Sequence, residues 1–71
     1  MKNAKVTYTH KRPPYWEVTH TDGRWWSASY NRDTHAWLIT NNQGRILDEW
    51  GPTGQKVLDV VYNYERGTTD L

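Results

Sequence analysis

The chain has 71 residues, with five tryptophans, five tyrosines, no phenylalanine and no cysteine, and its formal net charge is +1 at pH 7. This length allows one small domain, and the absence of cysteine excludes disulfides and cysteine-ligated zinc. Because the first twenty residues lack an apolar run, we expect no signal peptide. No segment is long enough to cross a membrane, so the expected location is the cytoplasm.

Alternation of apolar and polar residues predicts five β-strands, near residues 5–10, 15–20, 24–30, 35–40 and 45–50. These segments are rich in β-branched and aromatic residues, and residues that favour turns separate them. Pro13 and Pro14 fall between the first two segments. Proline cannot donate ladder hydrogen bonds, so this corner is expected to be stiff and close to a sheet edge.

The loop Thr21–Gly23 decides which side chains of the second and third strands share a face. A two-residue turn is one alternative. A three-residue loop with Gly23 in the left-handed conformation instead pairs Val18 with Trp26 and Trp16 with Ala28. We favour the second, because a one-residue slip would mix apolar and polar side chains on both faces. The predicted inner face carries Trp16, Val18, Trp26, Ala28 and Tyr30, and the outer face carries Tyr15, Glu17, Thr19, Trp25, Ser27 and Ser29.

The inner face is predicted to continue into the fourth strand. A four-residue loop after Tyr30 would place Ala28 opposite Trp37. The next turn, at residues 41–44, is clear, but it leaves the register of the fifth strand open. Either Ile46 or Leu47 points inward.

The hydrophobic period changes after Gly51-Pro52, and a helix is predicted near residues 54–66. Thr53 is a suitable N-cap, Gly67 a suitable residue just past the end, and residues 68–71 should fray. The apolar residues of this segment gather on one side: Val57, Leu58, Val60, Val61 and Tyr64. The predicted fold class is therefore α+β, an antiparallel meander of four to five strands with one C-terminal helix packed on one face.

The sequence lacks the spacing of a catalytic or metal site. The serines of the third strand alternate without the G-x-S-x-G context of a nucleophile. Asp48 and Glu49 are adjacent, so they would point to opposite faces of a strand rather than form a carboxylate pair. The three histidines are far apart in the sequence, although His10 and His20 could meet across strands. We expect a non-enzymatic protein without a metal or cofactor.

The outer face combines tyrosine and tryptophan with serine and threonine, the side chains of adaptable protein-binding surfaces. Trp25 is the ring expected to be exposed, because Trp26 takes the inward position. We predict a small regulator or inhibitor that binds another protein through this face, of the kind found in phages and mobile elements, such as anti-restriction or anti-CRISPR factors. The alternative is a solvated face without a role. The predicted contact residues are Tyr15, Trp25, Ser27, Arg24 and Arg32.

Two other functions remain open. The first is a sheet-based DNA- or RNA-binding regulator with contacts from Lys11, Arg12 and Arg24, in which exposed aromatic rings stack on unpaired bases. The hairpin sequence Asp-Gly-Arg-Trp-Trp at residues 22–26, within three strands and a helix over roughly residues 15–66, resembles the small sheet-plus-helix DNA-binding domains at the N-termini of phage-type integrases. This resemblance implies DNA binding. The weak basic balance favours a protein partner instead, because phosphate contacts supply most nucleic-acid affinity. The second is a homodimer joined through an edge strand.

Overall fold

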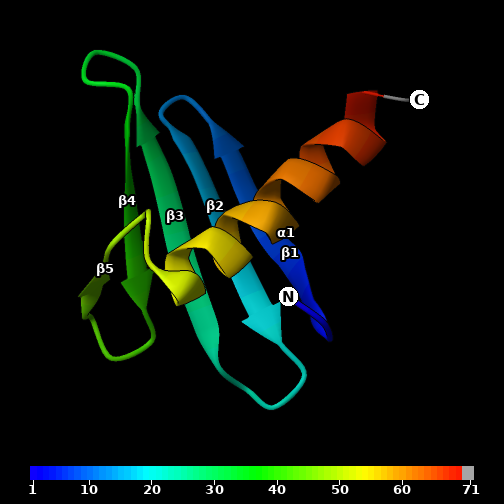
Figure 1. The fold of residues 1–71 in the computed structure, drawn as a ribbon. Helices are drawn as coiled ribbons and strands as arrows, with labels where there is room; N and C mark the ends of the chain where they lie inside the picture. Colours follow the sequence, from blue (N-terminus) through cyan, green and yellow to red (C-terminus); the bar gives the residue numbers. More distant parts are fainter. Residues whose placement is uncertain (70–71) are drawn as a thin grey trace.

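The computed structural model describes the backbone of residues 1–69 and the side chains of residues 1–67, and it confirms the α+β prediction. Five antiparallel strands follow one another across the sheet in chain order, and one helix crosses one face (Figure 1). No helix within residues 1–69 is both long and apolar enough to span a membrane. The elements are β1 (Ala4–Lys11), β2 (Pro14–His20), β3 (Trp25–Asn31), β4 (Ala36–Asn41), β5 (Ile46–Leu47) and α1 (Pro52–Thr69).

The β2–β3 hairpin has the predicted register, with Val18 paired to Trp26 and Trp16 to Ala28. Gly23 adopts φ = 97°, a left-handed value that glycine takes without steric cost. The N–H of His20 donates to the carbonyl of Arg24 at 2.8 Å and closes the loop. The three-residue loop therefore separates the apolar face from the polar face as the alternation requires.

The predicted register between β3 and β4 is wrong by two residues. Ala28 pairs with Ile39 rather than Trp37, and Trp37 pairs instead with Tyr30. An even shift keeps every side chain on its face, so the inner face still runs through both strands. What changes is the position along the strand, which moves Trp37 towards the end of the sheet.

Asn31 explains this shift. It stays in β3, paired with Ala36, and its side-chain oxygen accepts the N–H groups of Asp33 at 2.9 Å and Thr34 at 3.3 Å. The loop is consequently residues 32–35 rather than 31–34, and its last residue, His35, takes φ = 57°. Histidine is among the residues that more readily adopt this conformation.

The fifth strand is shorter than the predicted range 45–50. Leu47 points inward and packs against the core, whereas Ile46 points outward and is 69% exposed. The chain turns directly afterwards, because the Asp48 side chain accepts the N–H of Trp50 at 3.1 Å and its carbonyl accepts the N–H of Gly51 at 3.0 Å. Trp50 itself lies on the surface, 78% exposed.

Helix α1 begins and ends outside its predicted bounds of 54–66. Gly51 is the cap, since its carbonyl accepts the N–H of Gln55 at 2.9 Å, and Pro52 occupies the first helical position, where its missing N–H costs nothing. Thr53 is thus inside the helix and is not the N-cap. Gly67 does not end the helix, which continues to Thr69. Of the predicted frayed tail, 68–69 are helical in backbone, and 70–71 lie outside the described residues.

The core lies between the inner face and the first half of α1. Figure 1 shows the helix crossing the sheet diagonally, so that its C-terminal turns pass beyond β1. The second half of the helix is therefore exposed, including Tyr64, which was expected to face the core and is 40% exposed. The buried apolar residues are Val18, Trp26, Ala28 and Ile39 from the sheet and Val57, Leu58, Val60 and Val61 from the helix.

Candidate functional site

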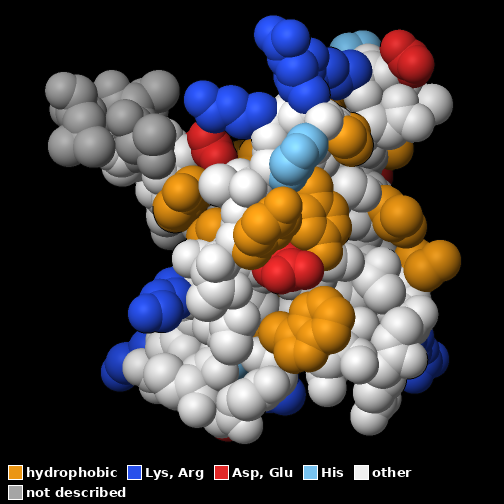
Figure 2. Space-filling view, turned by 180° about the vertical axis from the view of Figure 1, so that it is seen from behind, with side chains coloured by type: hydrophobic (Ala, Val, Ile, Leu, Met, Phe, Trp, Pro, Cys, Tyr) orange, Lys and Arg blue, Asp and Glu red, His pale blue; other side chains and the backbone are white. Residues whose placement is uncertain are grey.

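The face of the sheet opposite α1, here called the outer face, carries a set of accessible apolar side chains. Figure 2 views the molecule from this side and shows hydrophobic side chains gathered around an acidic group. Four of them are 41–69% exposed, and Tyr15 is partly buried. They come from all five strands: Tyr8, Tyr15, Trp25, Leu38 and Ile46.

Glu17 lies in the middle of this face. It pairs with Tyr8 on one side and with Ser27 on the other, and that row continues to Thr40 and Ile46. The hydroxyl of Tyr15 donates to the Glu17 carboxylate at 2.6 Å. This hydrogen bond, followed by burial and by repulsion from the Glu17 charge, raises the pKa of Tyr15 to about 12.

Three of the predicted contact residues share the outer face: Tyr15, Trp25 and Ser27. Tyr15 pairs with Ser29, and Trp25 pairs with Thr19. Tyr15 and Trp25 are therefore four residues apart along the ladder, roughly 13 Å at a rise of about 3.3 Å per residue. The two rings flank Glu17 and do not touch each other.

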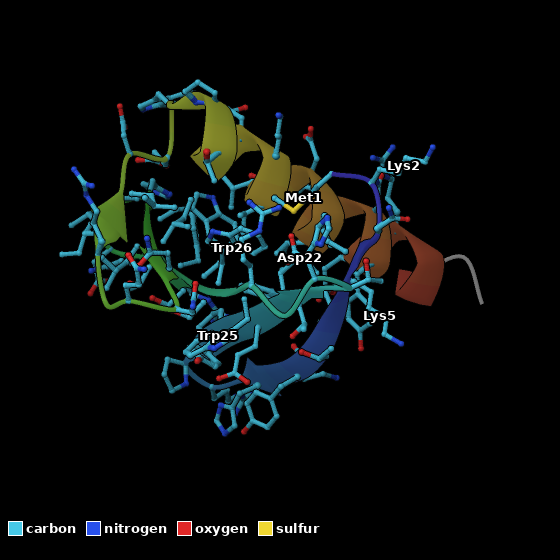
Figure 3. The ribbon with its side chains drawn as sticks, turned by 90° about the horizontal axis from the view of Figure 1, so that it is seen from below. Met1, Lys2, Lys5, Asp22, Trp25 and Trp26 are labelled. Carbon is cyan, nitrogen blue, oxygen red and sulfur yellow. The ribbon has the colours of Figure 1, made fainter. Side chains whose placement is uncertain are left out.

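Arg24 does not lie at the rim of the outer face, contrary to the prediction. Its guanidinium carbon is 5.6 Å from the ring centroid of Trp26, and its Nε donates to Asp22 at 2.8 Å. Figure 3 shows Trp25 and Trp26 pointing to opposite sides of the sheet, with Trp26 on the side of α1. Arg24 follows Trp26 to that side because both belong to the inward half of the alternation. The N–H of Arg24 donates to the Asp22 carboxylate, which holds the pKa of Asp22 below its usual range.

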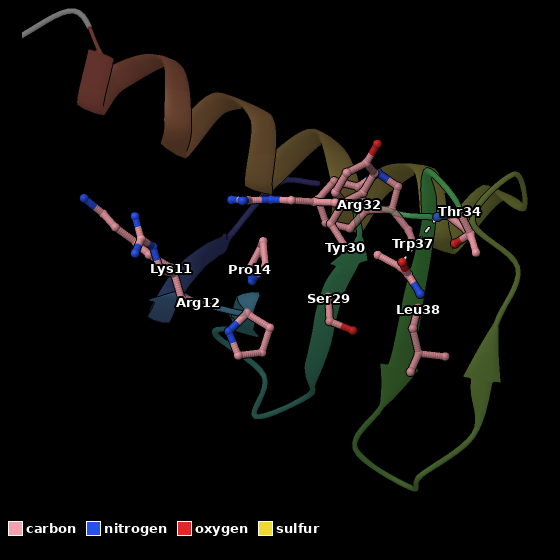
Figure 4. Close-up of a pocket in the computed structure, with 12 residues that line it drawn as sticks. Lys11, Arg12, Pro14, Ser29, Tyr30, Arg32, Thr34, Trp37 and Leu38 are labelled. Atoms are coloured by element: carbon pink, nitrogen blue, oxygen red, sulfur yellow. Dashed lines mark hydrogen bonds between the residues drawn. The ribbon is translucent and has the colours of Figure 1, made fainter.

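Arg32 does not lie beside Trp25 either. The six steps from Trp25 to Asn31, the last residue of β3, already amount to roughly 20 Å, and Arg32 follows Asn31. Arg32 lines a hollow together with Lys11 and Arg12. In Figure 4 its side chain extends from the β3–β4 loop towards these two residues of the β1–β2 hairpin. The predicted nucleic-acid contacts Lys11 and Arg12 are thus brought to Arg32 and not to Arg24.

This end of the sheet holds two adjoining hollows of about 660 and 700 Å³, here called the hairpin-end groove. One hollow opens towards the outer face at Ser29 and Leu38, and the other towards α1 at Tyr62 and Glu65. Six residues line both hollows: Lys11, Arg12, Pro14, Tyr30, Arg32 and Trp37.

Aromatic rings form the wall of the groove beneath the helix. The ring centroid of Trp37 is 5.0 Å from that of Tyr30, 5.3 Å from Trp16 and 6.0 Å from Tyr62. Trp16 and Trp37 were expected in the core but are only partly buried. The strand order could have predicted this site. In a meander the β1–β2 and β3–β4 connections lie at the same end of the sheet, which brings Lys11 and Arg12 near Arg32.

The edges of the sheet resist pairing with a second copy. The register of β1 against β2 shifts between Val6 and Tyr8, which is a bulge, and Lys5 and Lys11 lie on this edge strand. The opposite edge, β5, has two residues. Bulges, lysines and short strands are the devices by which sheets avoid edge pairing, so the geometry does not favour the edge-strand homodimer, the second alternative left open by the sequence.

Metal ligands do not converge in the described part of the chain. No group of three or more His, Cys, Asp or Glu side chains within it could hold a metal ion. His10 pairs with Tyr15 and His20 pairs with Ala4, at opposite ends of the β1–β2 ladder. The two histidines therefore do not meet across strands, as the sequence had left open.

No protein-family model, no curated protein and no solved structure matches the chain. The resemblance to integrase N-terminal domains gains no support from these comparisons and rests on the residues quoted above.

Proposed function

We propose that this protein is a small non-enzymatic regulator or inhibitor that binds another protein through the outer face of its sheet. The observation that carries the proposal is the set of accessible apolar side chains on that face: Tyr8, Tyr15, Trp25, Leu38 and Ile46. Apolar side chains that gather on one face of a small protein, with polar residues among and around them, are typical of an interaction site. Inhibitors of the phage and mobile-element type are the class we propose.

The charge of the outer face favours a protein over a nucleic acid. Among the strand residues that point outward, the charged side chains are Lys5 at the edge and Glu17 in the centre. Nucleic acids are bound mainly through contacts between cations and phosphates. A central carboxylate with one peripheral lysine repels that backbone, whereas it suits a protein surface of mixed polarity.

Glu17 also indicates what the partner presents. One carboxylate oxygen accepts the Tyr15 hydroxyl at 2.6 Å, and the carboxylate is flanked by the rings of Tyr8 and Tyr15. Carboxylates form their strongest hydrogen bonds with cationic donors, and aromatic faces attract cations. We therefore propose a partner that places an arginine or lysine against Glu17, with apolar side chains around it.

A photo-crosslinking experiment tests whether the outer face is the contact surface. A photoreactive amino acid at position 46 should trap the partner in cells that contain it, because Ile46 is 69% exposed on this face and does not line the hairpin-end groove. The same amino acid at position 59, on the exposed side of α1, is the control and should trap nothing. Trapping from position 59 alone would place the contact on the helix and contradict the proposal.

Affinity measurements with the purified partner then test the residues. Trp25→Ala should weaken binding by about 2 kcal/mol, roughly thirtyfold in Kd, as truncation of a tryptophan hot spot does. Trp50→Ala removes the same ring from a site that is 78% exposed and lies beside α1, where Trp50 lines a hollow with Gln55 and Leu58, and it should leave the Kd unchanged. The double variant Tyr15→Ala/Trp25→Ala should abolish binding. If the double variant folds and binds with unchanged affinity, the outer face is only solvated surface.

A further inference from the structure

The hairpin-end groove gathers three cationic side chains and one carboxylate, Glu65, which leaves it with an excess of positive charge. Lys11 and Arg12 come from the β1–β2 hairpin, and Arg32 comes from the β3–β4 loop. All three are exposed, and within the described side chains none has a carboxylate within ion-pair distance. By contrast, Arg24, at the other end of the sheet, is bound to Asp22. Three cations around one hollow form a receptor for an anion with more than one charge.

The same groove offers aromatic surface. Trp37 contacts the rings of Tyr30, Trp16 and Tyr62 and remains only partly buried, while Tyr62 is 47% exposed. Glu65 is the acidic residue of the groove, and it accepts the Trp16 indole N–H at 2.6 Å. That hydrogen bond fixes the Trp16 ring against the helix.

We propose that the hairpin-end groove binds a short segment of single-stranded nucleic acid. Bases stack on the rings of Trp37 and Tyr62, and phosphates lie against Lys11, Arg12 and Arg32. Non-specific single-strand binding combines these two elements, a basic path for the backbone and aromatic platforms for the bases. The two adjoining hollows, of about 660 and 700 Å³, are in the size range of small-molecule pockets, so each suits one nucleotide.

Two other anionic macromolecules suit the groove less well. A duplex conceals the faces of its bases, so the aromatic wall would contribute nothing. An acidic peptide would satisfy the cations but would leave the rings without planar groups to stack on. The groove adjoins the outer face at Ser29 and Leu38, but neither Trp25 nor Glu17 lines it.

Tryptophan fluorescence titrated with a decamer of deoxythymidine or of uridine tests the proposal on the full chain. Stacking on the groove should quench the fluorescence. With three phosphates neutralised, the logarithm of the binding constant should fall with the logarithm of salt concentration with a slope of about −2, at roughly 0.7 per phosphate. A duplex of the same length should bind more weakly than the single strand, and a polyglutamate peptide should not quench.

Matched arginine variants then locate the site. Arg12→Gln and Arg32→Gln should each weaken binding about fivefold near 0.1 M salt and reduce the salt slope by about 0.7. Arg45→Gln makes the same change in the exposed turn at the other end of β4 and should have little effect. Trp25→Ala should leave the affinity for the single-stranded oligonucleotide unchanged, which separates this site from the outer face.

Any of three results would overturn the proposal. The first is the absence of quenching by either oligonucleotide at low salt. The second is equal loss of affinity in the Arg45 and Arg32 variants, which would indicate general charge attraction. The third is tighter binding of the polyglutamate peptide than of the oligonucleotides, which would assign the groove to an acidic protein segment.

Discussion

The inner face of the sheet has two ends that differ in burial although they share the same strands and the same alternation. Under the first half of α1, Val18, Trp26, Ala28 and Ile39 are 0–4% exposed. At the end that holds the hairpin-end groove, the inward-pointing rings of Trp16, Tyr30 and Trp37 are only partly buried. Strand alternation therefore decides which face a side chain joins, and the path of the helix decides whether that part of the face becomes core or groove.

The two ends of the inner face also differ in the types of side chain that line them. The covered end is lined mainly by aliphatic residues, whereas the open end uses tryptophan and tyrosine, whose polar tips can reach a partner while the ring packs. Trp16 shows this directly, since its indole N–H donates to Glu65 and its ring packs on Trp37. A half-covered surface is stable with these residues, whereas aliphatic side chains there would be exposed without any polar contact.

The largest expected effect separates the two ends by truncation. Trp26→Ala should lower the free energy of unfolding by about 3–5 kcal/mol, as loss of a buried large ring does. Trp16→Ala should cost about half as much, because its ring is partly exposed already. Trp25→Ala, on the outer face, should cost less than about 1 kcal/mol. Denaturant titration measures all three, and equal losses for Trp16 and Trp26 would remove the distinction between core and groove.

The second prediction concerns how closely α1 approaches the chain that leads into it. A Cβ atom at Gly54 would collide with the backbone carbonyl of Asp48. Forced overpacking of this kind costs about 1–3 kcal/mol, and this exceeds the gain of about 1 kcal/mol from replacing a helical glycine by alanine. Gly54→Ala should therefore destabilise the protein in thermal unfolding.

Gly67 provides the matched control for this substitution. It lies in the same helix with nothing within 4 Å of an added Cβ. Gly67→Ala should leave stability unchanged or raise it by up to about 1 kcal/mol. If Gly54→Ala stabilised the protein as much as Gly67→Ala, the close approach at the start of α1 would be disproved.

The smallest effect concerns Tyr15, the outer-face ring whose hydroxyl donates to the Glu17 carboxylate. The pKa of Tyr15 is raised from 10.0 to about 12, so the folded protein favours the neutral phenol. The stabilisation is complete below pH 10 and is lost between about pH 10 and 12 as the phenol ionises. Phenolate absorbance, taken as the difference between the protein and Tyr15→Phe, should show this late ionisation. Glu17→Gln should bring it back towards 10, and an unchanged titration in that variant would contradict the hydrogen bond as its cause.

Much of the fold followed from local pattern. The bulged loop at Gly23, the pairing of Val18 with Trp26 and the assignment of Trp25 to the outer face are all confirmed. The reason is that a side-chain period of two leaves one register that buries an apolar face. The same rule kept the faces correct in β4 even though the register moved by two residues.

Of the candidate site, the sequence placed Tyr15, Trp25 and Ser27 on one face but grouped the basic residues wrongly. Arg24 was associated with Lys11 and Arg12 because it is near the aromatic residues in the sequence. In the structure it points to the helix side at the other end of the sheet, where Asp22 and Trp26 hold it. Alternation applied to Arg24 itself would have predicted its face, since it is two residues from Trp26.

By itself, then, the sequence determined the fold class, the two faces of the sheet and the hairpin at Gly23, because these depend on contacts within a hairpin and on periodicity. The tertiary structure alone decided that Trp16 and Trp37 line a groove with Lys11, Arg12 and Arg32. That outcome depends on the diagonal direction of α1 and on where its second half leaves the sheet. Amphipathic periodicity specifies which side of a helix is buried but not the angle at which it crosses the sheet, and that angle is set by the packing of side chains distant in sequence.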